Sequence, residues 1–393
     1  MEHISDRVRN LPPYLFAKLN KRKEELMAQG VDVIDLGIGA PDLPTPEFVI
    51  EELIRTAKKS ENHRYPAYDG NTDFKQAVAS FYKQQYDVDL NPETEVLALI
   101  GSKEGIAHLM QAVLNTGDQV LLPNPGYPVY ETGVKLAGAE SISFPLEEEK
   151  DFIPQFDQLH DIADKAKLMF LNYPSNPTSA TIHLKTFMEA VSFAKEHDLI
   201  IANDAAYDLV TFGDYKSPSI LQAPEAKEYA VEFGSLSKSF NMTGWRIGYV
   251  VGNEDVIHSL KTLKSNIDTG QFTPIQKAAI RALTSDLSAV KENNKVLENR
   301  METMYQGLID LGVKSKKPQG SIFIWAKVPK GFTSSHFAEK LLNEAGVIVT
   351  PGAAFGSAGE GYFRIAFTVT KERIEEVITR LKKLNFQEVS TEG

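Results

Sequence analysis

The chain has 393 residues, of which 42% are hydrophobic, and its formal net charge is −11 at pH 7. This length and apolar fraction allow a large core and favour two domains, or one large domain with an appendage. Acidic and basic residues are mixed along the chain without a basic stripe, so the sequence lacks the electrostatic footprint of a nucleic-acid binder. We therefore expect chemistry on small molecules and no nucleic-acid partner.

The N-terminal stretch MEHISDRVRNLPP lacks the apolar centre of a secretion signal, and no run approaches the ~18 apolar residues of a membrane span. The sequence contains no cysteine, which excludes disulfides, zinc–thiolate sites and a cysteine nucleophile. Its eight histidines are scattered without the spacing of metal ligands. We expect a cytoplasmic protein with no membrane partner and no metal.

Short apolar runs alternate with longer segments of helical periodicity over the first two thirds of the chain. The runs EVLALI, QVLLP, KLMFLNYP, LIIAND and YAVEFG are typical of buried parallel strands, and most precede segments such as GIAHLMQAVLN that have a helical repeat. This alternation predicts an α/β fold with a three-layer, doubly wound and mostly parallel sheet over residues 46–284.

The pattern changes after about residue 285. A long amphipathic segment is followed by the strand-like stretches SIFIWAKV, VIVT and YFRIAFT. A final helix carries Ile374, Val377 and Leu381 on one face. We expect these residues, 285–393, to form a smaller α+β domain together with residues 1–45.

Polar residues follow several of the predicted strands. Ligands of open α/β sheets bind outside the carboxyl ends of the strands, so these residues should share one rim. Taken singly, each has an ordinary explanation, such as a helix cap for Asp204 or a solvated cap for Lys238. Together they indicate a ligand site made of Ser102, Lys103, Tyr127, Asn176, Asp204, Tyr207, Ser235 and Lys238.

The stretch SLSKSFNMTGWRIGYVVG adds Arg246, which we expect inside a buried strand, where an arginine needs an anion. The helix start at Ser102, the Ser235 hydroxyl and this guanidinium would together hold a phosphate. A reactive lysine, a carboxylate for a pyridinium nitrogen and an aromatic residue over the ring are the remaining protein groups that pyridoxal phosphate requires. The pattern therefore predicts pyridoxal 5'-phosphate as the cofactor.

The order of the motifs GSKEG, PGYPVY, NYPSNPT, DAAY, SLSK and FRIAF resembles that of the pyridoxal-phosphate-dependent aminotransferases of class I/II, fold type I. The similarity covers nearly the whole chain, from GIGAPDLPTP to FRIAF, and is greatest to bacterial diaminopimelate, aspartate and alanine aminotransferases. It implies a transaminase that moves an amino group from an L-amino acid to a 2-oxo acid, with 2-oxoglutarate and glutamate as one pair, by ping-pong kinetics.

The resemblance also implies roles for single residues. Lys238 matches the lysine that forms a Schiff base with the cofactor and moves the proton, and Asp204 matches the carboxylate that keeps the ring nitrogen protonated. Tyr207 and Asn176 match the pair that hydrogen-bonds the ring hydroxyl, and Tyr127 matches the aromatic residue stacked on the ring. The phosphate ligands map to Ser102, the backbone of Lys103, Ser235 and Arg246.

Further matches concern the substrate and a second subunit. Arg364 matches the clamp for the substrate α-carboxylate, for which a guanidinium fork is well suited. Gly39 matches a backbone contact to that carboxylate, and Asn176 and Tyr14 match further substrate contacts. Tyr65 matches a tyrosine that reaches the phosphate of the neighbouring subunit, which implies a homodimer with shared active sites.

The amino donor stays open at this point. Diaminopimelate enzymes of the family carry an asparagine where this chain has Thr269 in DTGQFTPIQ, so aspartate, alanine, methionine and aromatic donors stand beside LL-diaminopimelate. Two other functions also stay open. A carbon–sulfur lyase of the same fold would use the same Lys238 and Asp204, and a non-catalytic sensor module could share the same shape.

Overall fold

The structure, a computed structural model, describes residues 3–9, 11 and 15–384. Its centre is a seven-stranded sheet with the strand order β2-β8-β7-β6-β5-β3-β4. Neighbouring strands are parallel except at β8, which is antiparallel to both β2 and β7. The strands are β2 (Val96–Leu99), β3 (Gln119–Asn124), β4 (Glu140–Pro145), β5 (Ala166–Leu171), β6 (Ile200–Asp204), β7 (Ala230–Ser235) and β8 (Gly248–Gly252).

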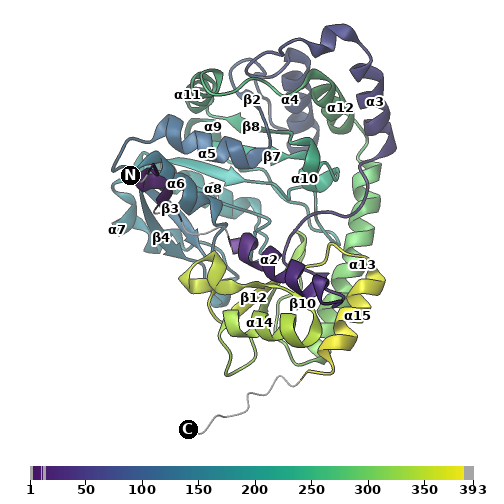
Figure 1. Cartoon of the computed structure of the whole chain (residues 1–393). Helices are drawn as coiled ribbons and strands as arrows, with labels where there is room; N and C mark the ends of the chain where they lie inside the picture. The colour runs from purple at the N-terminus through teal and green to yellow at the C-terminus, as the bar shows by residue number, and fades with distance from the viewer. Residues whose placement is uncertain (1–2, 10, 12–14, 385–393) are drawn as a thin grey trace.

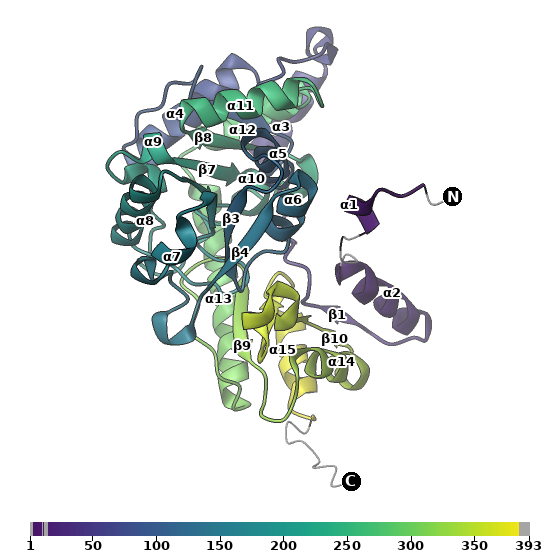
Figure 2. The ribbon, with the colours of Figure 1, turned by 90° about the vertical axis from the view of Figure 1, so that its left-hand side faces the viewer.

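Helices cover both faces of this sheet, which confirms the predicted three-layer α/β fold (Figures 1 and 2). Alternate residues of each strand point to opposite faces, so that Leu97 belongs to the buried cluster that includes residues of α5, α6 and α11, while Val96 belongs to the cluster that includes residues of α4, α8 and α12. The helices of this part are α3 (Glu47–Ala57), α4 (Thr72–Tyr86), α5 (Ser102–Val113), α6 (Val129–Ala137), α7 (His160–Ala163), α8 (Leu184–His197), α9 (Ala226–Tyr229), α10 (Leu236–Ser239), α11 (Glu254–Ser265) and α12 (Thr273–Leu283).

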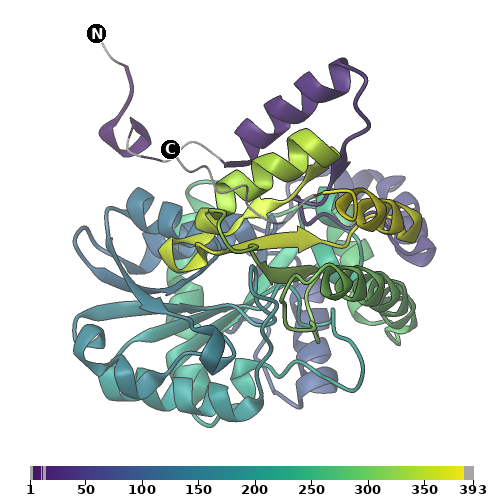
Figure 3. The same cartoon turned by 90° about the horizontal axis from the view of Figure 1, so that it is seen from below.

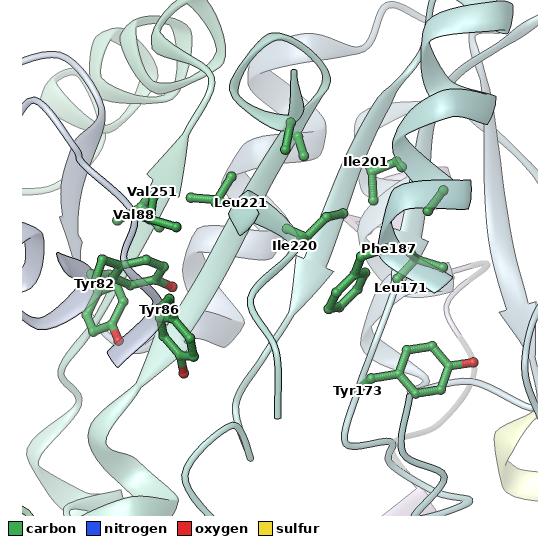
Figure 4. Packing of buried hydrophobic residues seen from close by; sticks show 14 of the residues in the cluster. Tyr82, Tyr86, Val88, Leu171, Tyr173, Phe187, Ile201, Ile220, Leu221 and Val251 are labelled. Atoms are coloured by element: carbon green, nitrogen blue, oxygen red, sulfur yellow. The ribbon is translucent and has the colours of Figure 1, made fainter. Parts of the chain in front are cut away.

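Figure 4 shows part of the core on the α4 and α8 side of the sheet, where Tyr82, Tyr86, Phe187 and Ile201 are buried. The hydroxyl groups of both tyrosines are hydrogen-bonded. Tyr82 donates a 2.9 Å hydrogen bond to Glu232, and Tyr86 donates one of the same length to Asp208. Buried polar groups of this kind must be paired, and here they are.

A second core forms where the C-terminal part meets the chain's beginning. A three-stranded antiparallel sheet has the order β11-β12-β9, and β1 pairs in parallel with β10. Figure 3 views this part from below. Its elements are α1 (Asp6–Arg9), α2 (Leu15–Ala28), β1 (Ile34–Asp35), α13 (Ser288–Asp310), β9 (Phe323–Lys327), α14 (Ser334–Ala345), β10 (Val347–Ile348), β11 (Thr350–Pro351), β12 (Tyr362–Ala366) and α15 (Lys371–Leu381).

Every strand and helix named in the sequence analysis is present, but the domain boundaries near residues 45 and 285 stay a prediction. β4 was not anticipated, because it is a largely exposed edge strand without a continuous apolar run.

None of the described helices is long and apolar enough to cross a bilayer. Short 3₁₀ turns complete the description at Ser60–His63, Glu148–Lys150, Phe156–Gln158, Ile220–Gln222, Thr243–Trp245, Gly352–Phe355 and Ser357–Gly359.

Candidate active site

A cavity of about 420 Å³ lies at the carboxyl ends of the parallel strands, between the seven-stranded sheet and the side chains of β9 and β12. This is the position expected for a ligand in an open α/β sheet. The fold therefore gathers there nearly all of the residues singled out from the sequence. Gly39, Ser102, Lys103, Tyr127, Asn176, Asp204, Tyr207, Ser235, Lys238, Arg246 and Arg364 all line this cavity.

Lys238 enters the cavity from α10, the single helical turn that follows β7. Ser235 caps this turn by accepting a 3.2 Å hydrogen bond from the Ser237 N–H. The Lys238 amine donates a 2.6 Å hydrogen bond to the Gly39 carbonyl. Burial lowers the pKa of this amine to about 8, and the nearby positive charges of Arg364 and Arg246 act in the same direction. The amine is therefore far easier to deprotonate than an ordinary lysine.

Asp204 is the last residue of β6 and is a buried residue of the cavity wall. Burial raises the pKa of its carboxyl group to about 6, while a hydrogen bond from Tyr130 and the nearby Ala206 N–H oppose the rise. The Tyr130 hydroxyl donates to Oδ2 over 2.9 Å, but Oδ1 accepts no hydrogen bond of normal geometry. A buried carboxylate oxygen without a donor is costly, so this atom indicates a ligand that presents an N–H.

The sequence analysis missed two residues that hydrogen-bond to Asp204, Tyr130 at the carboxylate and Asn172 at the backbone carbonyl. Tyr130 lies in α6, fully buried, with its ring stacked on Phe170 at 4.8 Å between centroids. Asn172 donates a 2.6 Å hydrogen bond to the Asp204 carbonyl and accepts one of 2.7 Å from the Asn176 N–H. The motifs PGYPVY and NYPSNPT contain both residues, but nothing in their local pattern shows that they contact Asp204.

Arg246 departs from the sequence expectation. It is exposed, has left-handed backbone angles (φ 54°, ψ 55°) and precedes β8, which begins at Gly248. The apolar run was read as one strand, but the turn at Thr243–Trp245 delays the strand and leaves the arginine outside it. The Gln271 side chain fixes this turn by donating 2.7 Å hydrogen bonds to the carbonyls of Trp245 and Arg246.

The new position of Arg246 is still compatible with an anion site. A Cβ atom at Gly101 would lie only 2.3 Å from a terminal guanidinium nitrogen of Arg246, so the guanidinium packs directly on the bare backbone before α5. The N-terminus of α5 at Ser102 carries the partial positive charge of a helix start, and its first N–H groups have no acceptor within the helix. The helix end and the guanidinium thus converge with Ser235 at one end of the cavity, where a phosphate group fits.

Arg364 approaches the cavity from the opposite side, on β12, and is 3% exposed. Its terminal nitrogens donate 2.6 Å hydrogen bonds to the Asn176 side chain and the Gly37 carbonyl, both of them uncharged acceptors. The guanidinium carbon lies 4.0 Å from the centre of the Phe323 ring and 4.8 Å from that of Phe355. A buried guanidinium held in this way is suited to bind a carboxylate.

One of the predicted site residues, Tyr65, does not line the cavity, and another lies outside the residues that the structure describes. Tyr65 is 89% exposed, as a residue serving a neighbouring subunit would be in a single chain. Tyr14 lies outside the described residues. The remaining arrangement fits pyridoxal phosphate, since it offers an anion site, a buried acceptor for the ring nitrogen at Asp204 and an amine of lowered pKa at Lys238.

Comparisons with known proteins agree with this geometry. Residues 31–381 match the family model described as aminotransferase class I and II. The chain is 50% identical to the LL-diaminopimelate aminotransferase of Moorella thermoacetica, over 96% of this chain and 97% of the relative. It is 48% identical to the enzyme of the same name from Aquifex aeolicus, over 98% of this chain and all of the relative. Substrate-bound BacF from Bacillus subtilis matches with a TM-score of 0.95 at 38% identity, covering 99% of this chain and 100% of that structure.

Proposed function

The chain belongs to the class I and II aminotransferases, which depend on pyridoxal phosphate and have fold type I, and we propose that its amino donor is LL-diaminopimelate. The observation that carries this choice is the name shared by relatives that are 44% to 50% identical over nearly the whole chain. We further propose 2-oxoglutarate as the amino acceptor and a ping-pong sequence, in which the donor product leaves before the acceptor binds.

In this proposal Lys238 is the group that moves the proton. When bound, pyridoxal phosphate supplies a carbonyl carbon for the amino group and a ring that takes up electrons from the substrate Cα. The Lys238 amine must be neutral to take the α-proton. With a pKa of about 8, about a quarter of it is neutral at pH 7.5, against about 0.1% for an ordinary lysine of pKa 10.5. Burial and the two neighbouring arginines thus increase the fraction of the Lys238 amine that is neutral and able to act as a base.

The other residues would bind the cofactor and the substrate and fix their orientation. Asp204 would accept a hydrogen bond at Oδ1 from the protonated ring nitrogen and keep the proton there, while Tyr130 holds Oδ2. Arg246 and the start of α5 would hold the phosphate. Arg364 would bind the substrate α-carboxylate with its fork, which turns the Cα toward the Lys238 amine at the other wall of the cavity.

We also propose that the functional unit is a homodimer with shared active sites. The proposal is supported by Tyr65, which is 89% exposed in the single chain. The loop around Gly270 contacts the segment at Ala67, so Phe272 and Tyr65 belong to one region of the surface. Dilution to monomers should then reduce activity, and a fully active monomer would contradict the shared site.

A spectroscopic half-reaction tests the donor. The purified holoenzyme is mixed with one amino acid at a time, without an acceptor, and the conversion of the cofactor from its aldehyde to its amine form is followed by absorbance. LL-diaminopimelate should convert it faster than meso-diaminopimelate, aspartate or alanine. Addition of 2-oxoglutarate should then restore the original spectrum and release glutamate, and initial rates should give parallel double-reciprocal lines.

The possible outcomes separate the parts of the proposal. Conversion by aspartate or alanine but not by LL-diaminopimelate would refute the donor and leave transamination intact. Restoration by pyruvate or oxaloacetate but not by 2-oxoglutarate would refute the acceptor. Release of ammonia and pyruvate from a sulfur-containing amino acid, without formation of the amine form, would favour the carbon–sulfur lyase.

A further inference from the structure

Two histidines that are distant in the sequence meet at the surface, away from the residues that line the cavity. His160 begins α7 and His197 ends α8, and their facing atoms, Nδ1 and Nε2, lie 2.8 Å apart. The adjacent Glu196 places its Oε1 3.6 Å from the same His160 nitrogen. Each of the three residues thus offers one potential ligand atom, and these three atoms all lie within 4.8 Å of one another.

The surroundings fix the orientation of these rings. His197 is the most enclosed of the three, with a side chain 8% exposed, and its other nitrogen, Nδ1, lies 3.3 Å from Asp164 Oδ1. A carboxylate on the far nitrogen of a histidine is the usual arrangement behind a metal-bound imidazole, because it fixes the tautomer that leaves Nε2 free to bind. The Phe193 ring packs against both imidazoles, with centroids 5.5 and 4.7 Å away.

A simple hydrogen bond between two neutral imidazoles would account for the His160–His197 contact, but it gives no role to Glu196. The distances also suit a metal. Zinc takes histidine nitrogens at about 2.0–2.1 Å, so two such ligands in a tetrahedral site lie ~3.4 Å apart. The histidine nitrogens would separate by about half an ångström, and the Glu196 oxygen already lies at a suitable distance from His160.

We propose that His160, His197 and Glu196 form a binding site for a divalent transition metal, with zinc as the best fit to two imidazoles and a carboxylate. The fourth position would be held by water. The site would join α7, which leads into β5, to the end of α8, which leads into β6. Its role is therefore structural, and it is independent of the proposed donor.

A second cluster shows what a site without a metal looks like. Glu104, His108 and Asp268 also place their ligand atoms close together. There, however, the amine of Lys264 already fills the centre, with hydrogen bonds of 2.8 Å to Glu104 and 2.9 Å to Asp268. Lys264 is 1% exposed and supplies the positive charge, so this cluster needs no cation from solution. At the first cluster, by contrast, no lysine or arginine among the described residues donates a hydrogen bond to His160, Glu196 or His197.

The test uses untagged holoenzyme that has been treated with a chelator and dialysed. Zinc is titrated by calorimetry into the wild type and into the His160→Gln and Glu196→Gln variants, whose altered side chains are 43% and 63% exposed. The wild type should bind one equivalent with a micromolar or lower Kd, and each variant should bind at least 10-fold more weakly. Asp164→Asn should weaken binding about 10- to 100-fold, as changes behind a metal ligand do.

The matched control is His108→Gln, which removes a histidine from the cluster that Lys264 already fills and should leave zinc binding unchanged. Zinc should also raise the Tm of the wild type and of the control, but not that of His160→Gln. Absence of a one-equivalent event in the wild type would overturn the proposal. So would equal binding by the wild type and both ligand variants, because it would place the zinc elsewhere. If His160→Gln is unstable, Glu196→Gln and the Tm shift decide.

Discussion

Replacing Gly101 by alanine should damage the phosphate end of the site through one contact. Gly101 has φ +83° and ψ 152°, a region that is almost restricted to glycine and that costs of order 1–3 kcal/mol for other residues. The new Cβ would also lie 2.3 Å from a nitrogen of Arg246. Because that nitrogen ends a flexible and exposed side chain, the guanidinium can swing away, and it would then leave the anion site.

The two effects can be measured separately. The loss of one hydrogen bond to a charged group is worth about 1.5–3 kcal/mol, which corresponds to roughly 10- to 150-fold weaker cofactor binding. Gly117→Ala is the control, since Gly117 has φ +85° but nothing within 4 Å of its Cβ position. Both variants should lose Tm in calorimetry, and only Gly101→Ala should bind pyridoxal phosphate more weakly when the apoenzyme is titrated. Equal cofactor affinity in the two variants would refute this account of the phosphate site.

Three further predictions concern the base, the clamp and the ring-nitrogen partner. Lys238→Ala should abolish turnover while still allowing cofactor to bind, and near-normal steady-state activity would remove this residue from the mechanism. Arg364→Lys should lower kcat/KM about 10- to 100-fold, mainly through KM for the donor, because a lysine cannot form the bidentate pair; an unchanged KM would contradict the clamp. Tyr130→Phe removes a hydrogen bond that lowers the pKa of Asp204, so the pKa of Asp204 should rise above about 6. When the solution is acidified, the variant should therefore lose activity at a higher pH than the wild type. The rate–pH profile checks this shift, and Tyr173→Phe, which removes an equally buried hydroxyl bonded to a backbone carbonyl, should leave the acidic limb in place.

Local pattern was enough to predict the strands and helices that form the active-site rim. Continuous apolar runs of strand length end in polar residues at Asn172, Asp204 and Ser235, because a strand buried on both faces must be apolar until it leaves the sheet. Since parallel strands end on one side, that pattern also predicted a common ligand site before any contact was known. The identity and order of the polar residues then indicated the cofactor, because few other ligands need a lysine, a buried carboxylate and an anion site together.

Contacts between distant segments were decided only by the tertiary structure. Tyr130 reaches Asp204 because β5 alone separates β3 from β6, an order that periodicity along the chain does not contain. Arg246 lies outside its apolar run because a turn held by Gln271 interrupts it. His160 and His197 are 37 positions apart and show no ligand spacing, yet the packing of α7 against α8 brings their nitrogens together. Secondary structure follows from nearby residues, whereas a site depends on which elements the core places side by side.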